Sequence, residues 1–101
     1  MAFNNWAFIF LGNGQENPET DRAVIEVNGL KTTIVSVPDR ESAGPVALEL
    51  VELGAQSIEL CGGFGPTGTA RVIEATGGRV PVGSVSYGQE SLEGLAKIFA
   101  E

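Results

Sequence analysis

Apolar runs that suit β-strands alternate with helical patterns along this chain, and this alternation limits the folds available to it. Such alternation is typical of βαβ units, in which parallel strands form a sheet and helices pack on it. The sequence therefore predicts an α/β fold with a mostly parallel four-stranded sheet and three helices. The strand-like runs lie at 6–11, 32–37, 57–61 and 80–87, and the helical patterns at about 42–53, 66–76 and 89–100.

Proline and glycine mark the ends of the predicted helices. Pro45 fits the first turn of a helix that starts near Ser42, where backbone N–H groups have no partner, and Gly54 is placed to close that helix. Pro66 opens the second helix and Gly77 follows it. Apolar residues form one stripe on the first helix and one on the third: Val46, Leu50 and Leu53, and Leu92, Leu95 and Phe99.

The segment 12–31 allows two interpretations. Asn28-Gly29 stands between two strand-like runs, which is a strong local signal for a β-hairpin. The stretch PETDRAVIEV could instead begin a short helix at its proline and acidic residues. We favour the hairpin, which adds an antiparallel edge strand at about 23–27 to the sheet.

Length and composition predict one soluble α/β domain spanning 1–101. The 43% hydrophobic and 19% charged content is ordinary for a globular protein. No stretch approaches the roughly 20 apolar residues of a membrane span, and WAFIFL at 6–11 lacks the length and the preceding basic residues of a signal peptide. The single cysteine excludes an internal disulfide. We therefore expect a cytoplasmic protein that does not bind membranes.

Charge and missing residue types exclude several kinds of site. The formal net charge is −7 and the six basic residues are scattered, whereas nucleic-acid binding needs a clustered positive face. The chain has no histidine, which removes the commonest general base and transition-metal ligand. With one cysteine as well, a metal site is not expected. The glycines lack the spacing of a dinucleotide fingerprint or a P-loop, and we expect no cofactor.

Parallel strands place the loops that follow them at one rim of the sheet, where open α/β sheets bind ligands. The loop after 57–61 reads LCGGFGPTGTA. Its glycines let the backbone approach a ligand, and the N-terminus of the next helix favours an anion. The alternative is that they only permit a tight strand-to-helix turn with Phe64 over the core. The candidate ligand-binding residues are Gly62, Gly63, Phe64, Gly65, Thr67 and Thr69, the threonines as hydroxyl donors.

Four more residues at strand ends are candidates. Glu59 lies near the end of an internal strand, where we expect it to be partly buried, and burial without a cation would raise its pKa toward acid–base use. The alternative is that Glu59 is hydrogen-bonded to a neighbouring serine, a backbone N–H or a partner subunit and takes no part in chemistry. Cys61 either assists catalysis or is a small packed side chain, since no histidine is present to form a thiolate. Asp39 and Tyr87 either contact a ligand at the rim or serve as a turn cap and a core-capping aromatic.

The segments IELCGGFGP and VPVGSVSYG, with WAFIF and TTIVSVPDRESA before them, resemble a small prokaryotic family of stand-alone domains of unknown function. The resemblance covers nearly the whole chain. It implies the same fold and the same rim site, and it implies no activity. The residues on the characteristic segment are Glu59, Cys61, Gly62, Gly63, Phe64, Gly65 and Pro66.

Three functions remain open from the sequence. The first is a domain that binds an anionic small molecule, phosphorylated or carboxylated, at the rim. The second is a cofactor-free lyase or isomerase that uses Glu59 as acid or base, with Cys61 or Tyr87 assisting. The third is a structural or interaction module whose glycines serve folding alone. Because an open sheet this short leaves an edge or a face uncovered, we also expect a homodimer.

Overall fold

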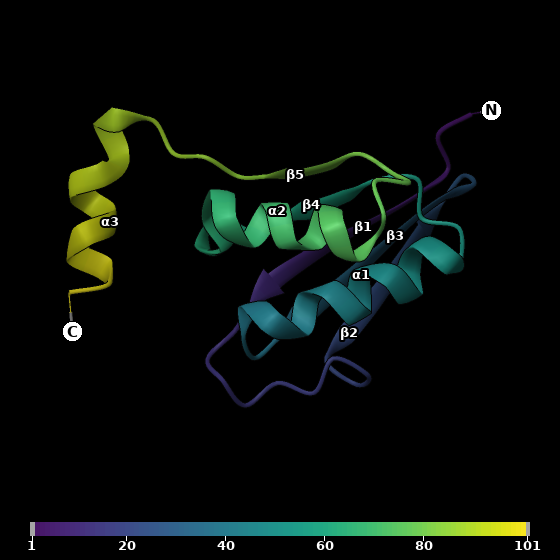
Figure 1. Cartoon of the computed structure of the whole chain (residues 1–101), viewed down its shortest axis with the longest axis horizontal. Helices are drawn as coiled ribbons and strands as arrows, with labels where there is room; N and C mark the ends of the chain where they lie inside the picture. Colours follow the sequence, from purple (N-terminus) through teal and green to yellow (C-terminus); the bar gives the residue numbers. More distant parts are fainter. Residues whose placement is uncertain (1, 101) are drawn as a thin grey trace.

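Five strands form one mixed sheet in the computed structural model, which describes residues 2–100 (Figure 1). The strand order is β2-β3-β1-β4-β5; β2 is antiparallel to β3, and the other neighbouring pairs are parallel. The predicted α/β class, the four parallel strands and the antiparallel edge strand are confirmed. The strands are β1 (Asn5–Leu11), β2 (Arg22–Val27), β3 (Leu30–Val37), β4 (Ile58–Leu60) and β5 (Val82–Ser84).

The β2–β3 connection is the tight hairpin that Asn28-Gly29 predicts. Asn28 and Gly29 have φ of 50° and 86°, the left-handed values that a type I′ hairpin loop requires at both positions. Val27 pairs with Leu30 directly across this loop. The alternative of a short helix near Pro18 is wrong, because residues 18–20 form only a turn before the strand begins.

The last strand is shorter than the apolar run at 80–87 predicts. Val85 donates its N–H to the Leu60 carbonyl (2.9 Å), and the chain then leaves the sheet. Because β4 ends at Leu60, the chain beyond Val85 has no strand beside it on that side. The extent of the predicted strand was therefore wrong, although its position and parallel direction were right.

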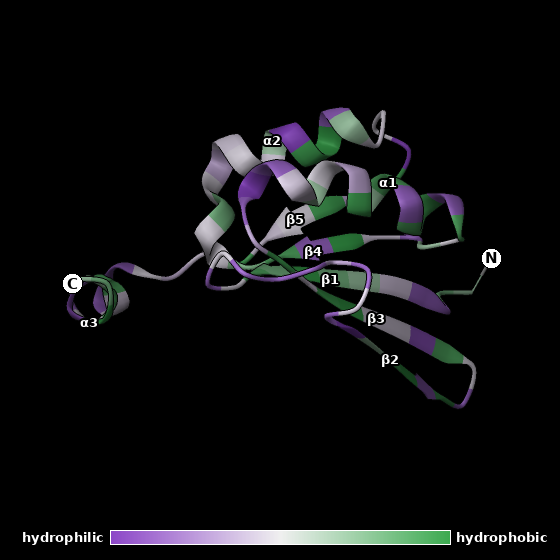
Figure 2. Cartoon of the chain, turned by 90° about the horizontal axis from the view of Figure 1, so that it is seen from below, coloured by the Kyte–Doolittle hydropathy of each residue, from purple (hydrophilic) through white to green (hydrophobic). Residues whose placement is uncertain are grey.

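Two helices, α1 (Ala43–Glu52) and α2 (Gly65–Ala75), cover one face of the sheet (Figure 2). Each follows a single turn of 3-10 helix, η1 (Arg40–Ser42) and η2 (Gly62–Phe64). Gly54 and Gly77 follow the two helices with φ of 107° and 66°. The predicted glycine caps are therefore confirmed.

The third helix, α3 (Leu92–Ile98), stands apart from the sheet beyond a short turn, η3 (Gln89–Ser91) (Figure 1). None of the residues of α3 is buried. The prediction that the helices pack on the sheet is therefore right for α1 and α2 and wrong for α3. Within residues 2–100, no helix is long and apolar enough to span a bilayer.

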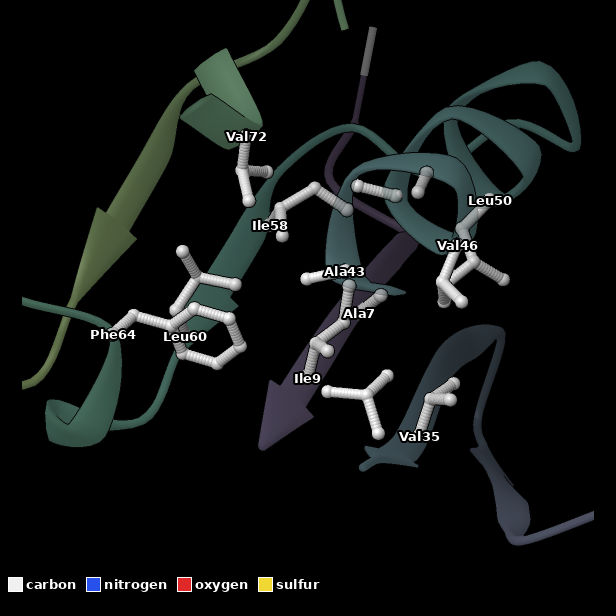
Figure 3. Packing of buried hydrophobic residues seen from close by; sticks show 13 residues of the cluster. Ala7, Ile9, Val35, Ala43, Val46, Leu50, Ile58, Leu60, Phe64 and Val72 are labelled. Carbon is white, nitrogen blue, oxygen red and sulfur yellow. The ribbon is translucent and has the colours of Figure 1, made fainter. Parts of the chain in front are cut away.

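The core lies between the covered face of the sheet and the two helices (Figure 3). Ala7 and Ile9 of β1 are fully buried in it. A Cβ built on Gly44 of α1 would lie only 3.1 Å from the Ala75 Cβ of α2, so the two helices are close neighbours. Leu53, which the sequence places on the buried stripe, is 64% exposed because α1 ends before it. The other core residues are Val35, Val37, Ala43, Val46, Ala47, Leu50, Ala55, Ile58, Leu60, Phe64 and Val72.

Shortening a core leucine should cost far more stability than shortening an exposed one. Leu60 is fully buried in β4, so Leu60→Ala leaves a cavity, and we expect the free energy of unfolding to fall by about 2–5 kcal/mol. Leu53→Ala is the matched control, expected within about 0.5 kcal/mol of the wild type. Urea unfolding followed by circular dichroism measures both. Equal losses in the two variants would contradict this core.

Candidate functional site

The turn that joins β4 to α2 lies at the rim where the parallel strands end. Phe64 extends from this turn into the core beside Leu60 (Figure 3), and its side chain is 2% exposed. The interpretation that Phe64 packs over the core is confirmed. This anchor fixes the turn and the first residues of α2 relative to the sheet.

Backbone geometry and packing account for the glycines of this turn. Gly65 has φ of 64° and ψ of −178°, a combination that is essentially restricted to glycine. A Cβ on Gly63 would lie 2.9 Å from Leu11 Cδ1, and a Cβ on Gly62 would lie 3.2 Å from the Val85 carbonyl oxygen. Backbone conformation and close packing therefore explain why glycine occupies these positions, and the glycine pattern alone does not indicate a ligand.

A surface depression of about 390 Å³ opens beside the turn. Its walls are the chain from Gly62 to Gly68 and two arginines, Arg40 of η1 and Arg71 of α2. We call this depression the arginine pocket. Its volume lies within the range of about 300–1,000 Å³ that is usual for small-molecule sites.

Arg40 lies along the turn and is held there by the backbone. Its Nε donates a hydrogen bond to the Gly63 carbonyl oxygen over 3.0 Å. Among residues 2–100, its two terminal nitrogens have no hydrogen-bond acceptor and no ion-pair partner. The guanidinium is therefore positioned by one N–H group and keeps four for a ligand.

Arg71 supplies the second positive charge of the arginine pocket. Its Nη1 lies 3.9 Å from Oε2 of Glu41, and the two side chains are 63% and 76% exposed. An exposed ion pair of this kind contributes at most about 1 kcal/mol, so an anion can compete with Glu41 for Arg71. Two of the six basic residues of the chain therefore border one depression.

Neither arginine was identified as a site residue from the sequence. For Arg40 a signal existed, because it directly follows Asp39 in a loop at the predicted rim. Arg71 lies inside α2, and only the close packing of α1 on α2 brings the segment that carries Arg40 to it. Helix packing of this kind is not encoded in the spacing of the two residues.

The two candidate threonines differ in what they can offer. Thr67 is exposed in the wall of the arginine pocket. The Thr69 hydroxyl donates to the Gly65 carbonyl oxygen (2.7 Å) inside the helix, so its proton is already engaged. Of the two, Thr67 is the one with a hydroxyl donor for a ligand.

Asp39 and Tyr87 make contacts within the fold at the rim. Neither is among the described residues that line the arginine pocket. Asp39 Oδ1 accepts hydrogen bonds from the Ser42 N–H (2.9 Å) and hydroxyl (2.7 Å), which makes it the cap of η1. Tyr87 is 53% exposed, and its ring lies beside Gly62, where a Cβ would be 3.4 Å from the ring. The turn-cap alternative thus describes Asp39, whereas Tyr87 packs over the glycine turn.

Glu59 is exposed, so the expectation that it is partly buried is wrong. It is in register with Phe8 of β1 and Gly83 of β5, on the face of the sheet opposite α1 and α2. No helix within residues 2–100 covers that face, which is why an internal strand leaves its carboxylate in solvent (Figure 2). The burial that motivated an acid–base role is missing.

Cys61 has the features of a packed side chain. Its Sγ accepts a hydrogen bond from the Leu11 N–H (3.4 Å), and the residue is half-buried against the core.

A second depression, of about 350 Å³, lies over β4 and β5 with Glu59 and Val85 in its wall. The described residues that line it include no arginine or lysine, so it is unsuited to an anion.

In the loop after β1, the Glu16 carboxylate accepts hydrogen bonds from backbone N–H groups of the same loop. Glu16 Oε2 accepts from the Asn13 N–H (2.7 Å) and Oε1 from the Gly14 N–H (3.0 Å). These backbone hydrogen bonds, with that of Asn13 the strongest cause, lower the pKa of Glu16 below its ordinary value. The Asn13 and Gly14 N–H groups of this rim loop are therefore used within the loop.

The chain belongs to a family of unknown function, DUF6506, whose model matches residues 4–100. The resemblance to a family of unknown function that the sequence predicted is thereby confirmed. No curated protein and no solved structure matches the chain. The description of the family states no activity.

A side chain at Gly65 should strain the turn. Because its backbone conformation is essentially restricted to glycine, we expect Gly65→Ala to lower the free energy of unfolding by about 1–3 kcal/mol. Gly83→Ala in β5 is the control, since a Cβ there has open space and its φ is not positive. Denaturant unfolding of both variants measures the difference. Equal stabilities would show that the Gly65 conformation is not required.

Proposed function

We propose that this domain binds an anionic small molecule, phosphorylated or carboxylated, in the arginine pocket. The observation that carries the proposal is the convergence of Arg40 and Arg71, from two different helical segments, on the first turn of α2. The N-terminus of this 11-residue helix adds a partial positive charge at the same place. Three positive features, one from η1 and two from α2, thus face one depression.

The chemistry of these groups suits phosphate or carboxylate. A guanidinium presents a planar fork of N–H donors that matches the oxygens of either group, and such charge-assisted hydrogen bonds are strong. Thr67 offers a hydroxyl at the same wall. Because the whole chain carries a net charge of −7, it repels anions at long range, so affinity depends on these local contacts.

The site supports binding better than it supports a reaction. Glu59 lies on the opposite face of the sheet, Asp39 caps η1 and Cys61 packs against Leu11. Among the described residues that line the arginine pocket there is no carboxylate, cysteine or tyrosine to transfer a proton or attack a substrate. We therefore propose a binding domain and no catalytic step.

Removing the Arg71 charge should reduce stabilisation by the ligand. A thermal-shift screen of the wild type against sugar phosphates and di- and tricarboxylates identifies a ligand, which at 100 times its Kd adds about 2.7 kcal/mol and raises Tm by several degrees. Arg71→Gln should weaken binding of that ligand about tenfold or more, since a hydrogen-bonded charge is lost. Arg79→Gln removes the same charge beyond the other end of α2 and should leave affinity unchanged.

Removing the Glu41 charge should have the opposite effect. Glu41→Gln frees Arg71 from a competing carboxylate, and we expect a few-fold tighter binding of the same ligand. Isothermal titration calorimetry measures both variants. The proposal fails if no anion in the screen raises the Tm of the wild type, or if affinity is indifferent to Arg71→Gln and Glu41→Gln.

A further inference from the structure

The helix α3 has little to hold it within its own chain. Leu92, Ile98 and the adjoining Phe99 are 52%, 69% and 77% exposed. The helix has seven residues and includes Gly94, whereas isolated helices shorter than about 12–15 residues are marginal in water. A stable α3 therefore needs an apolar surface to pack on.

The face of the sheet opposite α1 and α2 is not covered by any helix of residues 2–100, and we call it the open face (Figure 2). The rings of Phe8 and Phe10 stack there with centroids 6.2 Å apart, and Ile25 is 52% exposed. Parallel sheets normally have helices on both faces, so an apolar face of this kind requires a further layer. The register places Trp6, Phe8, Phe10, Ile25, Val27, Thr32, Ile34 and Glu59 on it.

The open face and α3 match in chemistry. Leu92, Leu95 and Phe99 recur at helical spacing and give α3 one apolar stripe that can pack on the aromatic and aliphatic residues of the open face. The chain thus contains an uncovered apolar sheet face and a helix with an apolar stripe that can pack on it.

The position of α3 suits packing on the sheet of a second molecule better than packing on the sheet of its own chain. The segment 85–88 carries α3 beyond the end of the strands, away from the open face of its own chain (Figures 1 and 2). The radius of gyration is 14.1 Å, whereas a compact chain of this length has about 13 Å. Val85 and Tyr87 lie against Gly62, which fixes the start of this outward path.

We infer that α3 of one molecule packs on the open face of a second molecule, and that α3 of the second packs on the first. The protein is then a homodimer with exchanged C-terminal helices. A two-fold axis makes the two helix–sheet contacts identical and places one α3 on each open face. This inference does not depend on the arginine pocket, which lies at the rim.

Charges placed in the contact should dissociate the dimer. Sedimentation equilibrium of the full-length wild type should give twice the mass of one chain, and Leu95→Asp in α3 or Ile34→Asp on the open face should raise the dimer Kd on the order of 100-fold. Leu53→Asp, which places the same charge at an exposed site next to α1, should leave the Kd unchanged. If circular dichroism shows that Ile34→Asp is unfolded, Ile25→Asp on the edge strand replaces it.

Mixing the two defective variants tests the exchange itself. Leu95→Asp has an intact open face and Ile34→Asp has an intact α3, so an equimolar mixture restores one of the two contacts. We expect a 1:1 heterodimer that is tighter than either variant's homodimer. Neither a dimer joined face to face nor one joined through β2 or β5 gains anything from this mixture.

Two results would overturn the inference. One is a monomeric wild type whose α3 amides are protected from hydrogen exchange, because α3 then closes over its own sheet. The other is a dimer that Leu95→Asp does not weaken or a mixture that forms no heterodimer, because α3 is then not part of the contact. A wild-type dimer, weakened variants and a restored heterodimer together support it.

Discussion

Burial of one face of the sheet under two close-packed helices is the constraint on which the other features depend. β1 is central, and its Ala7 and Ile9 are fully buried beneath α1 and α2. The helices approach closely because Gly44 faces Ala75 and leaves no room for a larger side chain between them. The hydrophobic core is therefore on one side of the sheet, and the apolar residues on the other side need a packing partner other than α1 and α2.

The arginine pocket follows from the same packing. Phe64 inserts into the core and fixes where α2 begins, while Gly65 provides the backbone conformation that lets the chain turn from the sheet into the helix. The hydrogen bond from Arg40 to the Gly63 carbonyl then ties η1, which precedes α1, to this turn. Helix packing thus brings Arg40 and Arg71 to the border of one depression.

The sequence predicts most of the fold because the signals are local. Periodicity, the proline in the first turn of α2 and the caps at Gly54 and Gly77 act within a few residues, and the Asn28-Gly29 loop fixes its own hairpin. The candidate site was predicted less well, because contacts between distant segments bring Arg40 beside α2. The burial of Glu59 depended on whether a layer covers the second face, which is a property of the assembled molecule and not of the strand that carries it.

The glycine turn also affects which open face α3 can reach, because it contacts the segment that leads to α3. Gly62 allows the chain at Val85 and Tyr87 to pass close over the turn, and a side chain at position 62 would push it away. The same turn therefore forms a wall of the arginine pocket and directs the outgoing path of α3. Because β4 is too short to keep β5 paired beyond Val85, the chain has to leave the sheet at this point, and the direction in which it leaves decides which open face α3 can reach.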